Sequence, residues 1–289
     1  MKILVTGATG QLGYDVCREL TARRIPYVGV SLADCDITDK DAVYTLFRKE
    51  KPDAIIHCAA YTAVDKAESE SAIAFAVNET GTRSIAEMCK EQGKKMIYIS
   101  TEYVFPGTGE TFYEPMDQKD PQNVYGRSKL AGELAVMELL KKYFIVRISW
   151  VFGENGNNFV KTMLRLAETQ HELGIVADQI GSPTYTADLA PLLCDMVATE
   201  RYGVYHATNE GFCSWAEFAE EIFRLSGKQV KVRHLNSTEY PAKAVRPLNS
   251  RMSKACLDAA GFKRLPDWKN ALARYLALTV GDTPKRKTL

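Results

Sequence analysis

The chain has 289 residues, a length that fits one large domain or two modest ones. Hydrophobic residues make up 46% and charged residues 25%, and the 37 basic residues nearly balance the 36 acidic ones to give a net charge of +1. These values are typical of globular proteins and argue against a dedicated nucleic-acid-binding or membrane-surface protein, which would carry a basic surface.

The 7 cysteines and 4 histidines are scattered along the chain, and no cysteines are spaced as C-x-x-C. Metal sites and disulfide frameworks need tighter clusters, so we expect free thiols and no metal site. The N-terminal apolar run is too short for a signal peptide, and no run of about 18 apolar residues occurs. We therefore expect a cytoplasmic protein without a membrane span, whose basic run Lys285-Arg286-Lys287 is a solvated tail.

Short apolar runs alternate with longer amphipathic stretches in the first half of the chain. Continuous apolar runs are typical of strands that are buried on both faces of a parallel sheet. We expect such strands at Ile3–Thr6, Tyr27–Val30, Ala54–Cys58, Lys95–Ser100 and Phe144–Ser149. We expect helices at Leu12–Ala22, Asp39–Glu50, Ile73–Gln92 and Arg127–Lys142. This alternation predicts an α/β fold, a doubly wound parallel-sheet Rossmann domain with right-handed crossovers.

After Trp150 the alternation is less regular. We expect helices near Phe159–Thr169, Asp188–Thr199 and Trp268–Thr279, and strands near Ile175–Asp178 and Val204–Ala207. Ser214 and Glu217 have the spacing of a capping box, which predicts that a helix begins there. We interpret residues 1–150 as a dinucleotide-binding domain and 151–289 as mainly a smaller, less regular α/β substrate domain. Segments near 174–200 and 236–252 are expected to return to the first domain.

A glycine loop, Gly7-Ala8-Thr9-Gly10-Gln11-Leu12-Gly13, follows the first strand and opens the first helix. Glycines let the backbone turn tightly and approach a pyrophosphate, which the free amides at the start of the helix then bind. The spacing is G-x-x-G-x-x-G, the variant that short-chain dehydrogenases use. The loop therefore predicts that a nicotinamide dinucleotide binds here.

The end of the second strand should distinguish NAD from NADP, because a carboxylate there binds the ribose hydroxyls of NAD. The chain has Ser31 at this position, with Asp34 and Asp36 soon after it, and no arginine marks a phosphate pocket. The preference stays open at this point. NADPH is favoured, with NADH possible, because Ser31 itself would not repel a phosphate.

Tyr125 and Lys129 are four residues apart, which places them on one face of a helix. A nearby ammonium stabilises a phenolate and lowers its pKa, so Tyr125 could donate a proton to a substrate oxygen near neutral pH. Lys129 could also reach the cofactor ribose. The preceding strand ends in Ser100 and Thr101, at the sheet edge where such folds bind ligands. We expect Thr101 to bind the carbonyl oxygen, whereas Ser100 could equally be a satisfied strand-end hydroxyl.

Several longer segments of the chain resemble the dTDP-4-dehydrorhamnose reductases, an extended branch of the short-chain dehydrogenases. The segments in the N-terminal half are GATGQLG, HCAAYTAVDKAESE (57–70), ISTEYVFPGTGE (99–110), NVYGRSKLAGE (123–133) and RISWVFGENGNNFVKTMLRLA (147–167). The C-terminal ones are DQIGSPT (178–184), AVRPLNSRM (244–252) and LPDW (265–268). The resemblance extends over nearly the whole chain. It implies an NAD(P)H-dependent oxidoreductase that reduces a nucleotide-linked keto sugar.

The resemblance also implies roles for individual residues. The cofactor-binding residues would be Gly7, Gly10, Gln11, Leu12, Gly13, Asp36, Ile37, Ala59, Ala60, Tyr61, Thr62, Tyr125 and Lys129. Of these, Asp36 and Ile37 would lie along the adenine, and residues 60–62 would line the nicotinamide side. The substrate-binding residues would be Val64, Thr101, Glu102, Tyr103 and Trp150. Tyr125 would be the proton donor, Lys129 its activator, and Thr101 the third catalytic residue.

One position departs from the family pattern S-T-D-Y-V-F, because this chain has Glu102 where the family commonly has aspartate. The charge is kept and its reach is one methylene longer. Some relatives dimerise around magnesium, and Asp15 and Asp188 are the candidate ligands in this chain. Arg246 could bind the diphosphate or form a surface salt bridge.

The resulting hypothesis is a reductase of dTDP-4-dehydro-L-rhamnose, a small-molecule nucleotide sugar, in a protein that could form a homodimer. It would act in the biosynthesis of a cell-wall polysaccharide precursor. One alternative is a reductase of another nucleotide-linked 4-keto-6-deoxysugar. The others are an epimerase or dehydratase that retains NAD, and a dinucleotide-binding regulatory subunit without turnover.

Overall fold

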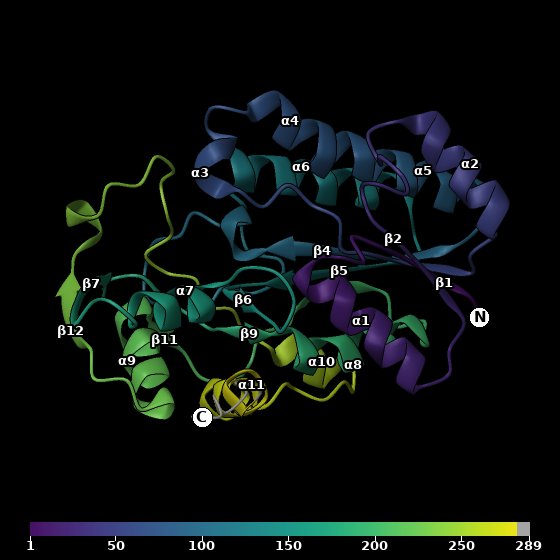
Figure 1. The fold of residues 1–289 in the computed structure, drawn as a ribbon. Helices are drawn as coiled ribbons and strands as arrows, with labels where there is room; N and C mark the ends of the chain where they lie inside the picture. Colours follow the sequence, from purple (N-terminus) through teal and green to yellow (C-terminus); the bar gives the residue numbers. More distant parts are fainter. Residues whose placement is uncertain (282–289) are drawn as a thin grey trace.

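Six parallel strands form the central sheet of the computed structural model, which describes residues 1–281 (Figure 1). The strands are β1 (Ile3–Thr6), β2 (Tyr27–Val30), β3 (Ala54–His57), β4 (Lys95–Thr101), β5 (Tyr143–Ile148) and β10 (Gly203–His206). They lie in the order β10-β5-β4-β3-β1-β2. The predicted doubly wound parallel sheet is confirmed. The basic run 285–287 lies outside the described residues.

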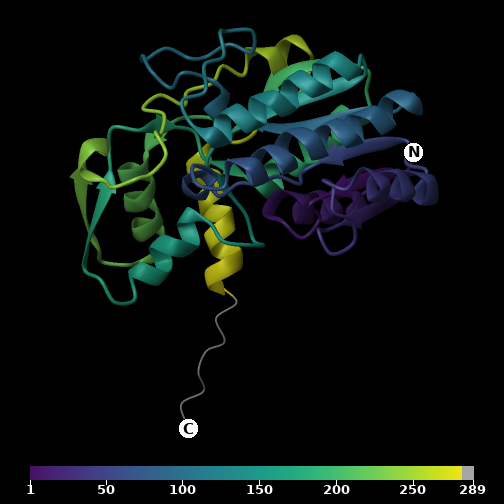
Figure 2. The ribbon, with the colours of Figure 1, turned by 90° about the horizontal axis from the view of Figure 1, so that it is seen from above.

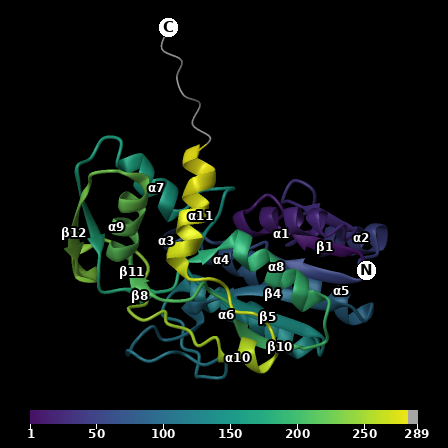
Figure 3. The same cartoon turned by 90° about the horizontal axis from the view of Figure 1, so that it is seen from below.

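Helices cover both faces of the sheet (Figures 1 and 3). One layer contains α2 (Lys40–Glu50), α3 (Val64–Ala67), α4 (Ser71–Phe75), α5 (Thr82–Glu91) and α6 (Val124–Leu139). The other contains α1 (Gln11–Ala22) and α8 (Thr186–Val197), which pack against each other, and α10 (Ala255–Ala259). Between α4 and α5 the backbone forms a π-helical turn, η1 (Ala76–Gly81), within the stretch for which we predicted a single regular helix.

Helix α6 begins three residues earlier than predicted. The Asn123 side chain caps it by accepting a hydrogen bond of 2.7 Å from the backbone N–H of Gly126. Side-chain oxygens at this position satisfy backbone donors that the helix itself leaves free. Because the helix starts at Val124, both Tyr125 and Lys129 lie in its first turns.

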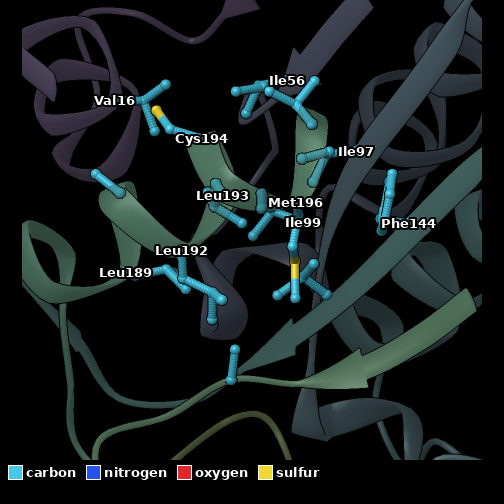
Figure 4. Close-up of a cluster of buried hydrophobic side chains, with 14 of the residues drawn as sticks. Val16, Ile56, Ile97, Ile99, Phe144, Leu189, Leu192, Leu193, Cys194 and Met196 are labelled. Carbon is cyan, nitrogen blue, oxygen red and sulfur yellow. The ribbon is translucent and has the colours of Figure 1, made fainter. Parts of the chain in front are cut away.

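The side chains of the central strands alternate between the two faces of the sheet, as the strand period requires. On the face covered by α1 and α8, Ile56, Ile97 and Ile99 pack against Val16 and Leu193 (Figure 4). On the opposite face a second cluster contains Leu4, Ile55, Met96, Ile85 and Met88. Burial of each large aliphatic side chain contributes about 1.5–3 kcal/mol, so these clusters hold the strand ends, and the site built on them, in place.

The region after β5 contains short pairs of strands beside one end of the main sheet (Figures 1 and 2). The pairs are β6 (Val151–Phe152) with β9 (Thr184–Tyr185), β8 (Ile180–Gly181) with β11 (Cys213–Ser214), and β7 (Glu172–Val176) with β12 (Lys231–Leu235). The helices here are α7 (Phe159–Leu166), α9 (Trp215–Ser226) and α11 (Trp268–Gly281). The predicted capping box is confirmed, because Ser214 and Glu217 bond each other's backbone N–H at the start of α9.

The chain returns to the main sheet after residue 150, because β10 pairs with β5 and α8 packs on α1. In contrast, β7 and β12 pair with each other. The proposed domain boundaries, with segments near 174–200 and 236–252 returning to the first domain, stay a prediction. In residues 1–281 no helix is long and apolar enough to cross a membrane. All seven cysteines lie in this range as free thiols.

Candidate active site

A cavity of about 890 Å³ lies at the carboxyl ends of the central strands. The strand order reverses between β1 and β3, and open α/β sheets bind their ligands at such a reversal. Every residue predicted to bind cofactor or substrate lines this cavity, from Gly7 at the end of β1 to Trp150 after β5. The structure therefore brings the predicted residues together, while their individual roles stay predictions.

One end of the cavity is built mainly from the glycine loop. Gly7 has a φ of +67°, and a Cβ there would stand 2.7 Å from the backbone nitrogen of Ala59. A Cβ on Gly13 would collide with the carbonyl oxygen of Gly7. Gly10 is the N-cap of α1, and within this fully described helix no side chain caps the N-terminus and the first turn has no acidic residue. The free amides and the close-packed backbone fit a dinucleotide pyrophosphate.

Ser31 follows β2 and is not acidic itself, but it holds the carboxylate of Asp34 beside it. The backbone N–H and the hydroxyl of Ser31 donate to Asp34 Oδ2 at 2.8 and 2.7 Å. These hydrogen bonds lower the pKa of Asp34, so the carboxylate is ionised at neutral pH. Ser31 and Asp36 line the cavity, and Asp36 accepts hydrogen bonds from Thr38. A negative charge thus lies close to where a ribose or its phosphate would bind.

The Thr101 hydroxyl, at the end of β4, is hydrogen-bonded to the side chain of the next residue, Glu102. It donates to Glu102 Oε2 at 2.7 Å and accepts from the backbone N–H of Tyr103 at 3.2 Å. Glu102 opens the short 3-10 helix η2 (Glu102–Val104) and is 4% exposed. Burial raises the pKa of its carboxyl group to about 7, against the opposing effect of the Thr101 hydrogen bond. Glu102 can therefore gain or lose a proton near neutral pH.

Lys129 is buried and Tyr125 is partly buried, and both side chains line the cavity. Burial, with a smaller contribution from Glu102, raises the pKa of Tyr125 above its usual value. Burial lowers the pKa of Lys129 to about 7, although the nearby Glu133 opposes this. The Lys129 Nζ lies 4.0 Å from the centre of the Tyr98 ring. The prediction of a lowered Tyr125 pKa is thus wrong for the protein alone, because burial disfavours the charged forms of both side chains.

A buried asparagine, which the sequence interpretation missed, joins the two sides of the site. Asn78 lies in η1, and its amide nitrogen donates to Ser128 Oγ at 2.9 Å and to the Tyr61 carbonyl at 3.0 Å. Its amide oxygen accepts from the Tyr61 N–H at 2.9 Å. Ser128 in turn donates to the carbonyl of Tyr125 at 2.8 Å. Asn78 therefore fixes the loop at residues 59–62 relative to α6.

Ser100 is buried and lines the cavity, and in the described part of the chain its hydroxyl oxygen has no hydrogen-bond partner. No protein group among the described residues satisfies this strand-end hydroxyl, so the choice between the two roles of Ser100 stays open. An unpaired buried hydroxyl is costly unless a ligand completes it. Together with Thr101, Ser100 can bind a polar atom of a bound molecule.

The far end of the cavity contains larger side chains. Trp150, Tyr103 and Val64 line it, and the rings of Tyr103 and Tyr125 meet edge to face at 5.4 Å. Arg246, beside them, donates to Asp65 Oδ2 at 2.7 Å and lies 3.5 Å from the Tyr103 hydroxyl. The salt bridge proposed as one alternative for Arg246 is therefore present.

Asp15 and Asp188, mentioned above for magnesium, each have protein partners. Asp15 accepts a hydrogen bond from the Thr186 hydroxyl. Asp188 pairs with Arg274 at 2.6 Å and accepts from Asn209 at 2.8 Å. Within residues 1–281 no group of three or more acidic, cysteine or histidine side chains is arranged to hold a metal ion.

Comparison with known proteins identifies one family across nearly the whole chain. A family model described as the RmlD substrate binding domain matches residues 1–280. The dTDP-4-dehydrorhamnose reductase of Aggregatibacter actinomycetemcomitans is 39% identical over 96% of this chain and 98% of its own. The crystal structure of the Clostridium acetobutylicum dTDP-4-dehydrorhamnose reductase covers 97% of this chain and 100% of its own, with a TM-score of 0.95 and 41% identity.

A second solved structure carries a dinucleotide. The dTDP-4-dehydrorhamnose reductase of Bacillus anthracis, in complex with NADP, is 42% identical over 96% of this chain and 99% of its own, with a TM-score of 0.93. This agreement in sequence and fold spans nearly the full length of both proteins. The chain belongs to the dTDP-4-dehydrorhamnose reductase family.

Proposed function

We propose that the protein reduces the C4 keto group of dTDP-4-dehydro-L-rhamnose to give dTDP-L-rhamnose, with NADPH as cofactor and NADH as a possible substitute. The observation that carries this proposal is the single cavity that joins the glycine loop to the Thr101, Tyr125 and Lys129 side chains. Several relatives that match nearly the whole chain bear the name of this reductase, and one was crystallised with NADP.

The glycine loop, Asp36 and Ile37, and residues 59–62 would hold the dinucleotide, which supplies a hydride when it is bound. Val64, Glu102, Tyr103 and Trp150 would hold the sugar at the other end of the cavity. The protein thus contributes positioning, which removes much of the entropic cost of bringing the reactants together.

Tyr125 would donate its phenolic proton to the carbonyl oxygen as that oxygen becomes a hydroxyl group. Thr101 would bind the same oxygen, and a proton on Glu102 would release the Thr101 hydroxyl to donate toward it. Lys129 lies one helical turn from Tyr125 and has a pKa of about 7, so part of it is charged near neutral pH. In that charged form it would stabilise the phenolate and return a proton.

The direct test is oxidation of NADPH and of NADH by the purified protein with enzymatically generated dTDP-4-dehydro-L-rhamnose. We expect rapid loss of the reduced nicotinamide absorbance, and its collapse in a Tyr125→Phe variant that still binds the dinucleotide. If the wild-type protein binds the dinucleotide but does not oxidise it with any of the keto sugars offered, the proposal is wrong. A regulatory subunit without turnover then becomes the better explanation.

A second candidate function is reduction of a different nucleotide-linked 4-keto-6-deoxysugar. It is favoured by Glu102, which is longer than the family's usual aspartate and lines the substrate end. The same assay with other dTDP- and UDP-linked 4-keto sugars distinguishes the two, because the preferred substrate has the highest kcat/KM. An epimerase or dehydratase would instead retain NAD through purification.

We also propose a cytoplasmic location and a homodimer. The free state of all seven cysteines fits a reducing compartment. The dimer rests on the family resemblance alone. Light scattering on the purified protein would test the dimer, and fractionation of its host cells would test the location.

A further inference from the structure

The indole of Trp150 does not stand alone at the substrate end of the cavity. It stacks on the indole of Trp215 with ring centres 3.7 Å apart and planes 12° from parallel. Trp150 lines the cavity, whereas Trp215 lies behind it as the first residue of α9. Because one face of Trp150 is covered by Trp215, the orientation of the wall that a ligand meets depends on a residue that does not line the cavity.

The backbone of Trp150 is strained. Its φ is +49°, in the left-handed region that bulky residues rarely adopt. Two neighbouring contacts hold this conformation, since Thr184 donates its N–H to the Trp150 carbonyl at 3.1 Å and its hydroxyl to the Ser149 carbonyl at 2.6 Å. Such strain persists only where the surroundings fix the residue.

The edge of the Trp150 indole is fixed as well. A Cβ on Gly181 would stand 2.7 Å from Trp150 Cε2, so only glycine leaves room for the ring. Gly181 pairs with Cys213 across β8 and β11, and the chain runs from Cys213 through Ser214 into Trp215. One strand pair therefore sets both the edge contact and the stacked face.

We infer that Trp215 is a positioning residue for the sugar site, which holds the strained Trp150 indole in the orientation that forms the substrate wall. The inference rests on the proposed function, in which Trp150 packs against the sugar. It gives α9 a role in substrate binding, because Trp215 opens that helix and also contacts Phe159, at 4.6 Å between ring centres.

A role in core packing alone would give a different result. Trp268 belongs to the same apolar cluster as Trp215 and also contacts Phe218, edge to face at 5.6 Å. It is 4% exposed and does not line the cavity, so it is a matched control for the loss of an indole. If Trp215 serves core packing alone, Trp215→Leu and Trp268→Leu should both lower stability, and neither should change substrate binding.

The experiment compares steady-state kinetics of the two variants with the wild type. Aromatic pairs contribute about 0.5–1.5 kcal/mol beyond burial, so we expect Trp215→Leu to raise the KM for the sugar nucleotide about 2- to 10-fold. The Kd for NADPH should not change. Trp268→Leu should leave both constants unchanged even where its melting temperature falls further. Trp215→Phe keeps an aromatic face and should recover most of the KM.

Circular dichroism gives a second readout that needs no substrate. The electronic transitions of two stacked indoles couple and give a paired positive and negative circular-dichroism band. Trp150→Phe and Trp215→Phe should each remove this paired band, and Trp268→Phe should retain it. Loss of that signal with an unchanged KM in Trp215→Leu would overturn the inference, as would equal effects of Trp215→Leu and Trp268→Leu on KM. If the wild-type protein reduces no keto sugar, the proposed function itself is overturned. Trp215 then has no sugar site to position.

Discussion

The two ends of the cavity are built in different ways. The cofactor end is formed largely by backbone, in which Gly7 and Gly13 leave room that any side chain would fill. The substrate end is formed by side chains such as Glu102, whose pKa is raised by burial, and Trp150, whose left-handed backbone is held by contacts with neighbouring segments. The first end is fixed by local geometry that a spacing pattern encodes, and the second by contacts between distant segments.

The largest effect should come from the chemistry at the junction of the two ends. Replacing Tyr125 with phenylalanine removes the proposed proton donor and leaves the ring that packs against Tyr103. We expect kcat to fall about 10²- to 10⁴-fold, the usual contribution of general acid catalysis. The Kd for NADPH, measured by quenching of protein fluorescence, should stay within a factor of about two, well below the tenfold that 1.4 kcal/mol represents.

A smaller but clear effect is expected at the cofactor end. Gly13→Ala would place a methyl group against the Gly7 carbonyl, and overpacking of this kind costs about 1–3 kcal/mol. We expect the loop to shift away from the added methyl group, and restoring it on binding would lower dinucleotide affinity about 5- to 150-fold, measured by titration calorimetry. Gly109→Ala is the control, since its φ of +79° also strains a side chain while nothing lies within 4 Å of the new Cβ. If both variants bind dinucleotide like the wild type, the loop is not the binding cradle.

The same contrast explains how much the sequence could predict. Strands β1 and β2 match their predicted bounds residue for residue, and the pairing of Tyr125 with Lys129 follows from helical spacing. The Asn78 contacts and the Trp150–Trp215 stack could not be predicted, because each joins segments tens of residues apart. The predicted direction of the Tyr125 pKa shift was wrong for a related reason, because the spacing of residues along a helix does not show how deeply they are buried.

Protonation at the substrate end should appear in the pH dependence of stability. Burial raises the pKa of Glu102 from 4.5 to about 7, so the folded state binds more protons than the unfolded state between these values. This buried carboxyl therefore destabilises the protein progressively as pH rises from 4.5 to 7, and the cost is constant above that. Glu102→Gln should be more stable than the wild type, by a margin that grows over this window in urea denaturation.

Lys129 provides the matched comparison, because its window lies on the other side of neutrality. Burial lowers its pKa from 10.5 to about 7, so the cost of burying it is full below pH 7 and disappears as pH rises toward 10.5. Lys129→Met should therefore gain most stability below pH 7, and lose that gain in alkali. Identical pH profiles for the two variants would show that these pKa shifts do not belong to Glu102 and Lys129.

The smallest effect concerns the choice between dinucleotides. The ionised Asp34 carboxylate, held by Ser31 at the end of β2, would repel a ribose phosphate and accept a hydrogen bond from a free ribose hydroxyl. Asp34 is exposed, so solvent screens the repulsion and its effect should be small. Asp34→Asn should therefore raise the ratio of kcat/KM for NADPH over NADH by about 1.5- to 5-fold. The shift should shrink at high salt, because an exposed charge acts less strongly there, and a ratio that does not depend on salt would mean that Asp34 acts through loop structure instead of charge.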